Sequence, residues 1–135
     1  MQYFLVVKDC IFVLMEILEI IIDRKLFSSK DIEELGIIEN QYLKLVNFKN
    51  SNDLIVDNEV LEDFDCVVTA NELGSSIKKI SDGKIVEHLN RENYKKLTYP
   101  LFLKSETFLQ FLKENNSEWN LIKFLEKHTF MINQI

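Results

Sequence analysis

The chain has 135 residues, of which 47% are hydrophobic, and its formal net charge is −6. This length fits one domain that buries its own core, and the apolar fraction excludes a disordered chain. Three glycines and one proline leave little room for linkers, so we expect a single domain over residues 1–135. The acidic balance argues against sequence-independent nucleic-acid binding, which depends on Lys and Arg neutralising phosphates.

The two cysteines and the apolar N-terminus indicate where the protein works. Cys10 and Cys66 lie in apolar runs, where a free thiol behaves as a small hydrophobe, so we expect a reducing, cytoplasmic location. Lys8, Asp9 and Glu16 interrupt the N-terminal apolar stretch, whereas a membrane span needs about 20 nearly uncharged residues. We therefore expect no membrane partner.

The first third of the chain is predicted to contain helices and strands in alternation. Apolar residues recur at helical spacing between positions 8 and 23, which predicts an amphipathic helix behind a short strand over 3–7. Ser28 can cap a second, short helix that Gly36 ends. Residues 41–48 carry enough apolar bulk to predict a strand.

The middle of the chain has the pattern of an antiparallel meander. A polar turn and a short strand are predicted over 50–56, and residues 64–70 alternate as a strand does. The runs 76–80 and 84–89 flank Asp82-Gly83, a dipeptide typical of tight hairpins because both residues tolerate positive φ. We therefore predict a β-hairpin over 76–89.

Near the C-terminus the apolar period changes to that of a helix. We predict a serine-capped helix that begins at Ser105 and a second helix that begins at Ser117. The buried residues are expected to be Phe108, Leu109, Phe111 and Leu112 in the first helix and Trp119, Ile122, Phe124 and Leu125 in the second.

Motifs that carry chemistry are not evident in the sequence. His88 and His128 belong to no metal-binding pattern, and no serine lies in a Gly-x-Ser-x-Gly turn. The glycines are not grouped, which excludes the known phosphate-cradling loops. We expect no catalytic residue, no metal and no cofactor. Lys95 and Lys96, near Arg91, form only a small basic cluster.

The densest polar feature is a run of five acids over positions 57–65. These acids are Asp57, Glu59, Glu62, Asp63 and Asp65. A calcium loop needs a turn glycine and a closing Glu at set spacing, and neither matches here. Two interpretations remain, a surface for a cationic partner and a solvated loop before a strand.

The order of these elements is similar to that of a known family. A short helix ends in Leu35-Gly36-Ile37-Ile38, a strand covers 64–70, a glycine turn covers 81–83, and residues 102–112 combine a serine with a Phe-Leu helix. This order resembles the SUKH superfamily of bacterial immunity proteins. The resemblance implies an α+β fold whose antiparallel-rich sheet, a meander with the Asp-Gly hairpin, is flanked by N-terminal and C-terminal helices.

The same resemblance implies a function. Such a protein is not an enzyme: it binds a cognate polymorphic toxin, of the nuclease or nucleic-acid deaminase class, and neutralises it stoichiometrically. The five acids would then form the toxin-binding surface, because such toxins tend to be basic where they hold their substrate. Two alternatives stay open: a non-inhibitory adaptor or regulatory domain, and a small hydrolase or transferase whose site is dispersed along the chain.

Overall fold

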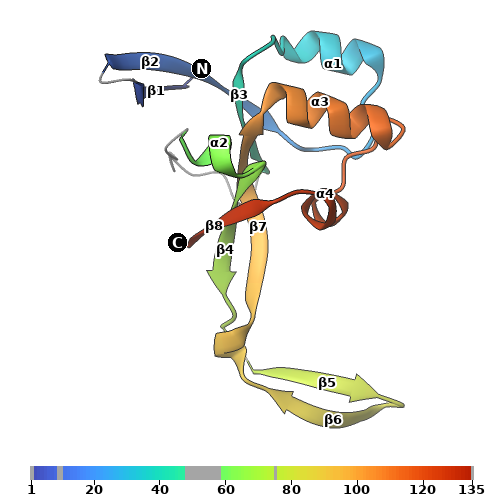
Figure 1. The fold of residues 1–135 in the computed structure, drawn as a ribbon. Helices are drawn as coiled ribbons and strands as arrows, with labels where there is room; N and C mark the ends of the chain where they lie inside the picture. Colours follow the sequence, from blue (N-terminus) through green and yellow to red (C-terminus); the bar gives the residue numbers. More distant parts are fainter. Residues whose placement is uncertain (1, 9–10, 48–58, 75, 135) are drawn as a thin grey trace.

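A six-stranded mixed sheet forms the body of the computed structural model, which describes residues 2–8, 11–47, 59–74 and 76–134 (Figure 1). Its strand order is β1-β2-β3-β7-β4-β8, and a separate two-stranded sheet consists of β5 and β6. The strands are β1 (Gln2–Lys8), β2 (Ile11–Ile21), β3 (Tyr42–Val46), β4 (Cys66–Glu72), β5 (Ile77–Ser81), β6 (Lys84–Leu89), β7 (Lys95–Lys104) and β8 (Phe130–Gln134). The helices are α1 (Ser29–Leu35), α2 (Val60–Asp63), η1 (Arg91–Asn93), α3 (Ser105–Glu114) and α4 (Leu121–Lys127).

The main sheet combines antiparallel and parallel pairs. Strands β1–β2, β3–β7 and β4–β7 pair antiparallel, whereas β2–β3 and β4–β8 pair parallel. A parallel pair needs a crossover connection, and α1 lies in the one between β2 and β3. Because β7 and β8 occupy both edges of β4, the hairpin cannot join it, and the expected meander of 64–70 with the hairpin is wrong. An α+β composition is compatible with this mixed architecture.

The N-terminal prediction was wrong in type. Residues 11–21 form β2 rather than a helix, and they pair with β1 on one side and β3 on the other. The segment contains four Ile, one Val and one Phe, residue types that fit a pleated strand. This preference together with two neighbouring strands outweighs the helical spacing. The short strand expected over 3–7 is confirmed by β1.

Other local predictions are confirmed with small shifts in their bounds. Ser28 caps α1 reciprocally with Asp31, and Gly36 ends the helix at a φ of 70°. The hairpin is present, with positive φ at Asp82 and Gly83. The turn and the strand expected over 50–56 lie outside the described residues. The strand expected over 41–48 is present as β3, which covers Tyr42–Val46.

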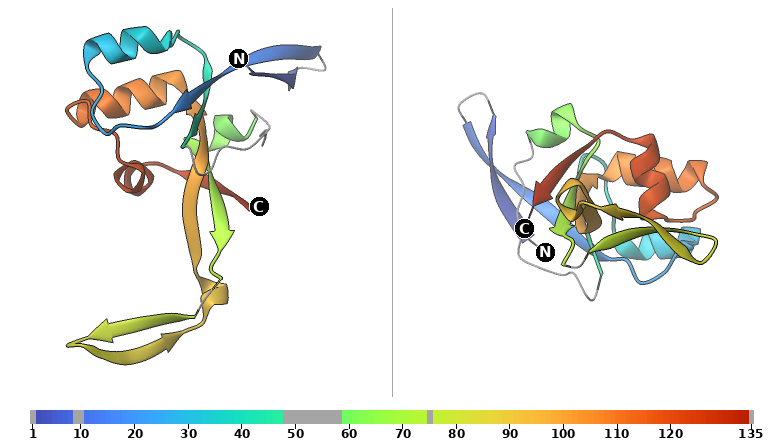
Figure 2. Two further views of the ribbon diagram at one scale, coloured as in Figure 1. Left: turned by 180° about the vertical axis from the view of Figure 1, so that it is seen from behind. Right: turned by 90° about the horizontal axis from the view of Figure 1, so that it is seen from below.

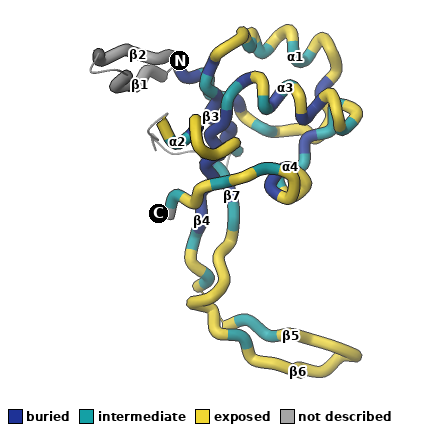
Figure 3. The backbone as a smooth tube through the Cα atoms, in the orientation of Figure 1, coloured by how far each residue is buried: buried dark blue, intermediate teal, exposed yellow. Residues whose placement is uncertain are grey.

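The hydrophobic core lies between one face of the sheet and the helices α1, α3 and α4 (Figure 2). Alternate residues of β3, β4 and β7 point toward these helices; they are Leu43, Leu45, Cys66, Val68, Leu101 and Leu103. On the opposite face, Val67 and Phe102 pack with Leu61 of α2. The buried residues are therefore concentrated at the end of the molecule that carries α1, α3 and α4, as Figure 3 shows.

An aromatic cluster fastens the C-terminal segment to this core. The ring centroids of Phe111, Trp119 and Phe124 lie 5.2–5.3 Å from one another. The indole Nε1 of Trp119 donates a hydrogen bond to the Tyr99 hydroxyl at 2.9 Å. Edge-on and tilted aromatic pairs at these distances add to the free energy gained from burial.

The second C-terminal helix begins later than predicted. The amide of Trp119 donates to Lys25 O at 2.6 Å, and Phe27 N donates to Ser117 O at 2.9 Å. These bonds hold 117–119 against the connection before α1, so α4 starts at Leu121, where the side chain of Asn120 caps it. Of the residues expected to be buried, Ile122 is 56% exposed, which corrects that prediction.

The first C-terminal helix begins at Ser105 as predicted, but the serine is not its side-chain cap. Its hydroxyl accepts a hydrogen bond from Gln41 N at 3.2 Å, and Ser105 N donates to Gln41 O at 2.8 Å. Phe108, Phe111 and Leu112 are buried as expected, whereas Leu109 is only partly buried. No helix among the described residues is long and apolar enough to cross a membrane.

Two neighbouring positions of α4 test this packing. Phe124→Ala should lower the free energy of unfolding by about 3–5 kcal/mol, because it empties a site enclosed by aromatic rings. Ile122→Ala, its exposed control, should change it by less than about 0.5 kcal/mol. Denaturant titration of both variants gives the comparison, and equal losses would contradict the orientation of α4.

Candidate active site

A hollow of about 420 Å³ lies where β4 ends and β7 begins. The residues Glu72 and Lys95 are direct partners in the last step of the β4–β7 ladder. Beyond them the chain leaves the sheet, forms the hairpin and returns through η1 (Figure 1). The hollow is lined by Glu72, Leu73, Gly74, Arg91, Glu92 and Lys95.

Backbone and side-chain hydrogen bonds fix the orientation of Arg91. The side chain of Asn90 accepts from Glu92 N at 3.1 Å and so starts the short η1 turn. The guanidinium of Arg91 then donates through one terminal nitrogen to Gly74 O at 3.2 Å. Arg91 is thereby held across the hollow, against the loop that follows β4.

The charges of the hollow are mixed. The Lys95 ammonium lies 3.5 Å from a carboxylate oxygen of Glu72, and the Glu72 side chain is 74% exposed. A guanidinium has five N–H donors in a planar fork, and within the described residues Arg91 directs one terminal nitrogen to the loop. The remaining donors and the Lys95 ammonium suit an anionic oxygen group, while Glu72 and Glu92 suit hydroxyl donors.

Two other hollows have a different character. One, of about 330 Å³, has a mainly apolar lining between residues 22–25 and 119–122. The other, of about 320 Å³, lies between the end of β2 and α1, and its Arg24 pairs with Asp23 at 3.3 Å and Asp31 at 2.9 Å. The first is also lined by two cations, Arg24 and Lys25, but Arg24 is paired with the carboxylates of Asp23 and Asp31.

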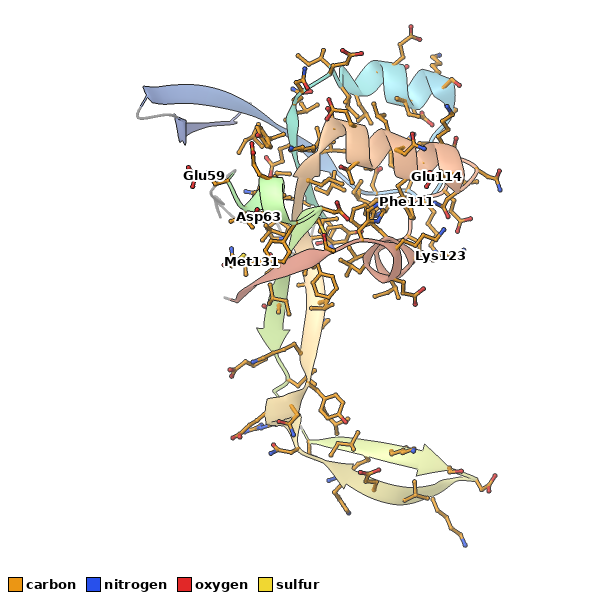
Figure 4. The ribbon with its side chains drawn as sticks, in the orientation of Figure 1. Glu59, Asp63, Phe111, Glu114, Lys123 and Met131 are labelled. Carbon is orange, nitrogen blue, oxygen red and sulfur yellow. The ribbon has the colours of Figure 1, made fainter. Side chains whose placement is uncertain are left out.

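The described residues of the predicted acidic surface do not reach the Glu72–Lys95 hollow. Asp57 lies outside the described residues, and Glu59, Glu62 and Asp63 are exposed at α2 (Figure 4). Asp65 has a structural contact, because its carboxylate accepts from Thr129 N at 3.0 Å. That bond joins the start of β4 to the start of β8, at the opposite end of β4 from the hollow (Figure 1).

The residues that line the hollow were missed because they are separated along the chain. In the sequence, Arg91 and Lys95 belong only to a small basic cluster. A usable signal was present: a hairpin inserted between two strands must return to the point where it left, which brings the residues before and after it together. Glu72 and Lys95 stand at those two positions.

His128 and the described cysteine have structural surroundings, whereas His88 is exposed in β6. His128 stacks on Phe124 with a centroid distance of 4.1 Å, and its Nδ1 lies 2.9 Å from Phe124 O. Cys66 is free and buried, and burial, with a contribution from Asp65, raises the pKa of its thiol to about 12. Among the described residues no cluster of three or more His, Cys, Asp or Glu could hold a metal ion.

Comparison with known proteins relates this fold to nucleotide-transferring enzymes. The fold is similar to 4-diphosphocytidyl-2C-methyl-D-erythritol synthase from Anaerococcus prevotii, with a TM-score of 0.51 and 15% identity over 76% of this chain and 54% of that chain. It is also similar to 2-C-methyl-D-erythritol 4-phosphate cytidylyltransferase from Thermus thermophilus, with a TM-score of 0.50 and 6% identity over 70% and 52%. No protein-family model and no curated protein matches the chain.

These likenesses concern the fold, and the chain spans about half the length of the enzymes that it matches. They overturn three expectations. The SUKH resemblance is wrong, because the matching architecture is that of nucleotidyltransferases. The immunity function and the expectation of a non-enzyme are wrong on the same finding, because the proteins that share this fold are enzymes of another class.

The environment of Cys66 predicts a pH dependence of stability. Its thiol has an ordinary pKa of 9.0 when unfolded and about 12 when folded, so the unfolded chain loses this proton first as the pH rises. The stabilising contribution of Cys66 is therefore present below pH 9.0 and declines toward pH 12. In a Cys10→Ser background, the difference in unfolding free energy between Cys66 and Cys66→Ala should shrink over this interval. A constant difference would show that the thiol is accessible to water.

Proposed function

We propose that the chain carries the acceptor-phosphate site of a nucleotidyltransferase, at the Glu72–Lys95 hollow. The observation that carries the proposal is that Arg91 and Lys95 both line one hollow at the end of the β4–β7 ladder. The similarity of the fold to cytidylyltransferases supports it, as do the carboxylates beside the cations. The substrate class is a phosphorylated polyol or sugar.

The proposed reaction joins two phosphates. A phosphate oxygen of the acceptor attacks the α-phosphorus of a nucleoside triphosphate, a new P–O–P bond forms, and the bond to pyrophosphate breaks. Phosphoryl-group chemistry of this kind depends on positioning and on offsetting negative charge. Arg91 would bind and orient the acceptor phosphate, Lys95 would offset its charge, and Glu72 and Glu92 would accept hydrogen bonds from hydroxyl groups of the acceptor.

The nucleotide half of the reaction is not assigned to residues of this chain. Its glycines at positions 36, 74 and 83 are separated in sequence, whereas phosphate-cradling loops group them. The residues of the hollow would therefore bind the acceptor, and transfer of the nucleotide is tested separately. A cytoplasmic location belongs to the same proposal and is supported by the free thiol of Cys66.

Binding of a phosphate ester tests the site. The purified chain should bind 2-C-methyl-D-erythritol 4-phosphate more tightly than the same polyol without phosphate, with inorganic phosphate as a second probe. Arg91→Ala should weaken binding roughly tenfold or more, because hydrogen bonds to charged groups contribute about 1.5–3 kcal/mol. Arg91→Lys should recover only part of the loss, since it keeps the charge without the planar fork. Isothermal titration calorimetry gives the dissociation constants.

A matched control is Lys123→Ala, which removes an exposed cation of α4 and should leave binding unchanged. Equal binding of the polyol and its phosphate would contradict the acceptor-phosphate site. If binding were lost in the control as well as in Arg91→Ala, binding would depend on the net charge of the protein and not on the hollow. Release of pyrophosphate from cytidine triphosphate, with and without the phosphate ester, then tests transfer separately.

A further inference from the structure

Strand β8 lies at one edge of the six-stranded sheet (Figure 1). It pairs with β4 through five consecutive residue pairs, from Cys66 with Phe130 to Ala70 with Gln134. Among the residues that the structure describes, no strand pairs with the other side of β8. An edge strand presents unpaired N–H and C=O groups, so a further extended segment can continue the sheet there.

The sequence of this edge lacks the features that usually prevent such pairing. Edge strands are commonly protected by charged side chains, by proline or by a bulge. Residues 129–135 include no charged residue and no proline, and the register of β8 with β4 is unbroken. Two apolar side chains of β8 are exposed, Met131 at 44% and Ile132 at 43%. The composition of β8 therefore favours an added strand and not a solvated edge.

The two faces of the sheet beside β8 offer different surroundings. Ile132 pairs with Val68, on the face that α1, α3 and α4 cover. Met131 pairs with Val67, on the face against which α2 packs. Successive residues of a strand point to opposite faces, so the residues of an added strand alternate between these two surroundings.

On the α2 side these surroundings are acidic. Glu62 and Asp63 are exposed on α2, and Figure 4 shows Asp63 on the same side of the molecule as Met131. These three residues are called the α2 face. Lys and Arg side chains beside Met131 would cover it with their methylene stems, while their charged ends reach the carboxylates. On the helix side, a residue next to Ile132 gains free energy from being apolar.

We propose that the edge of β8 binds an extended segment of a partner protein in which apolar residues alternate with Lys or Arg. The main chain of the segment pairs with β8 and provides affinity, while its side chains provide selectivity through the two faces. A second copy of β8 does not meet this requirement, because its residues 129–135 carry no cation and each copy has a net charge of −6. The contact does not depend on the acceptor-phosphate site proposed at the Glu72–Lys95 hollow.

Short labelled peptides test this contact, with fluorescence anisotropy as the measurement. A peptide of alternating Lys and Val should bind the chain at least about tenfold more tightly than one of alternating Glu and Val. A version of the Lys–Val peptide that is N-methylated at every residue keeps the side chains and charges but has no N–H to donate. It should bind about tenfold more weakly or less, because main-chain pairing with β8 is then lost. Equal binding of the two Lys–Val peptides would show that charge attraction alone holds them, and would overturn the proposal.

Charge reversal on the protein locates the contact. Glu62→Lys/Asp63→Lys should bind the Lys–Val peptide at least about tenfold more weakly, because it reverses the charge of the α2 face. The matched control is Glu33→Lys/Glu34→Lys, which makes the same change at exposed positions of α1 and should keep most of the binding. Arg91→Ala should also keep it, because this variant alters only the hollow.

Three outcomes would overturn the proposal. They are no binding of the Lys–Val peptide at about 1 mM, equal binding of the Lys–Val and Glu–Val peptides, and a loss in the α1 control as large as that in the α2 variant. Circular dichroism of each variant separates loss of the contact from loss of the fold, and the comparison of the methylated and unmethylated peptides uses the unaltered chain.

Discussion

The ladder between β4 and β7 joins the two ends of this molecule, and its register determines what each end contains. At one end Cys66 pairs with Leu103 and Val68 with Leu101, inside the core. At the other end Glu72 pairs with Lys95, at the rim of the hollow. A single continuous pairing therefore connects the most buried part of the protein to its candidate site.

An irregularity in this ladder is compensated by a buried hydrogen bond. The register shifts between Val68, which pairs with Leu101, and Thr69, which pairs with Thr98, so β7 holds two additional residues there. One of them is Pro100, which has no N–H to donate to a ladder. The Thr69 hydroxyl donates to Pro100 O at 2.8 Å, and this bond satisfies a carbonyl that the interrupted ladder leaves inside the protein.

The two ends also differ in charge, and this division relates the proposals to the fold. The core end carries the acidic α2 face, while the far end carries the cations of the hairpin and of the hollow. The cations that line the hollow suit a phosphate ligand. Arg91 and Lys95 line the hollow, whereas Lys78 and Lys84 belong to the hairpin.

The sequence by itself determined the elements whose signals are local. Ser28 and Gly36 bound α1, Asp82-Gly83 set the hairpin, and the apolar stripe of α3 placed Phe108 and Leu112 in the core. Each signal acts within a few residues, through a cap, a positive φ or a helical repeat, so it is readable without knowing the fold.

Only the tertiary structure decided the features that depend on distant neighbours. Residues 11–21 became a strand because β1 and β3 supply its hydrogen-bond partners, and Trp119 lies outside α4 because Lys25 O accepts its amide. The site has the same origin, since Glu72 and Lys95 meet through a register that no local pattern specifies. Short-range preferences contribute little free energy per residue compared with burial and sheet pairing, and long-range contacts therefore decide wherever the two compete.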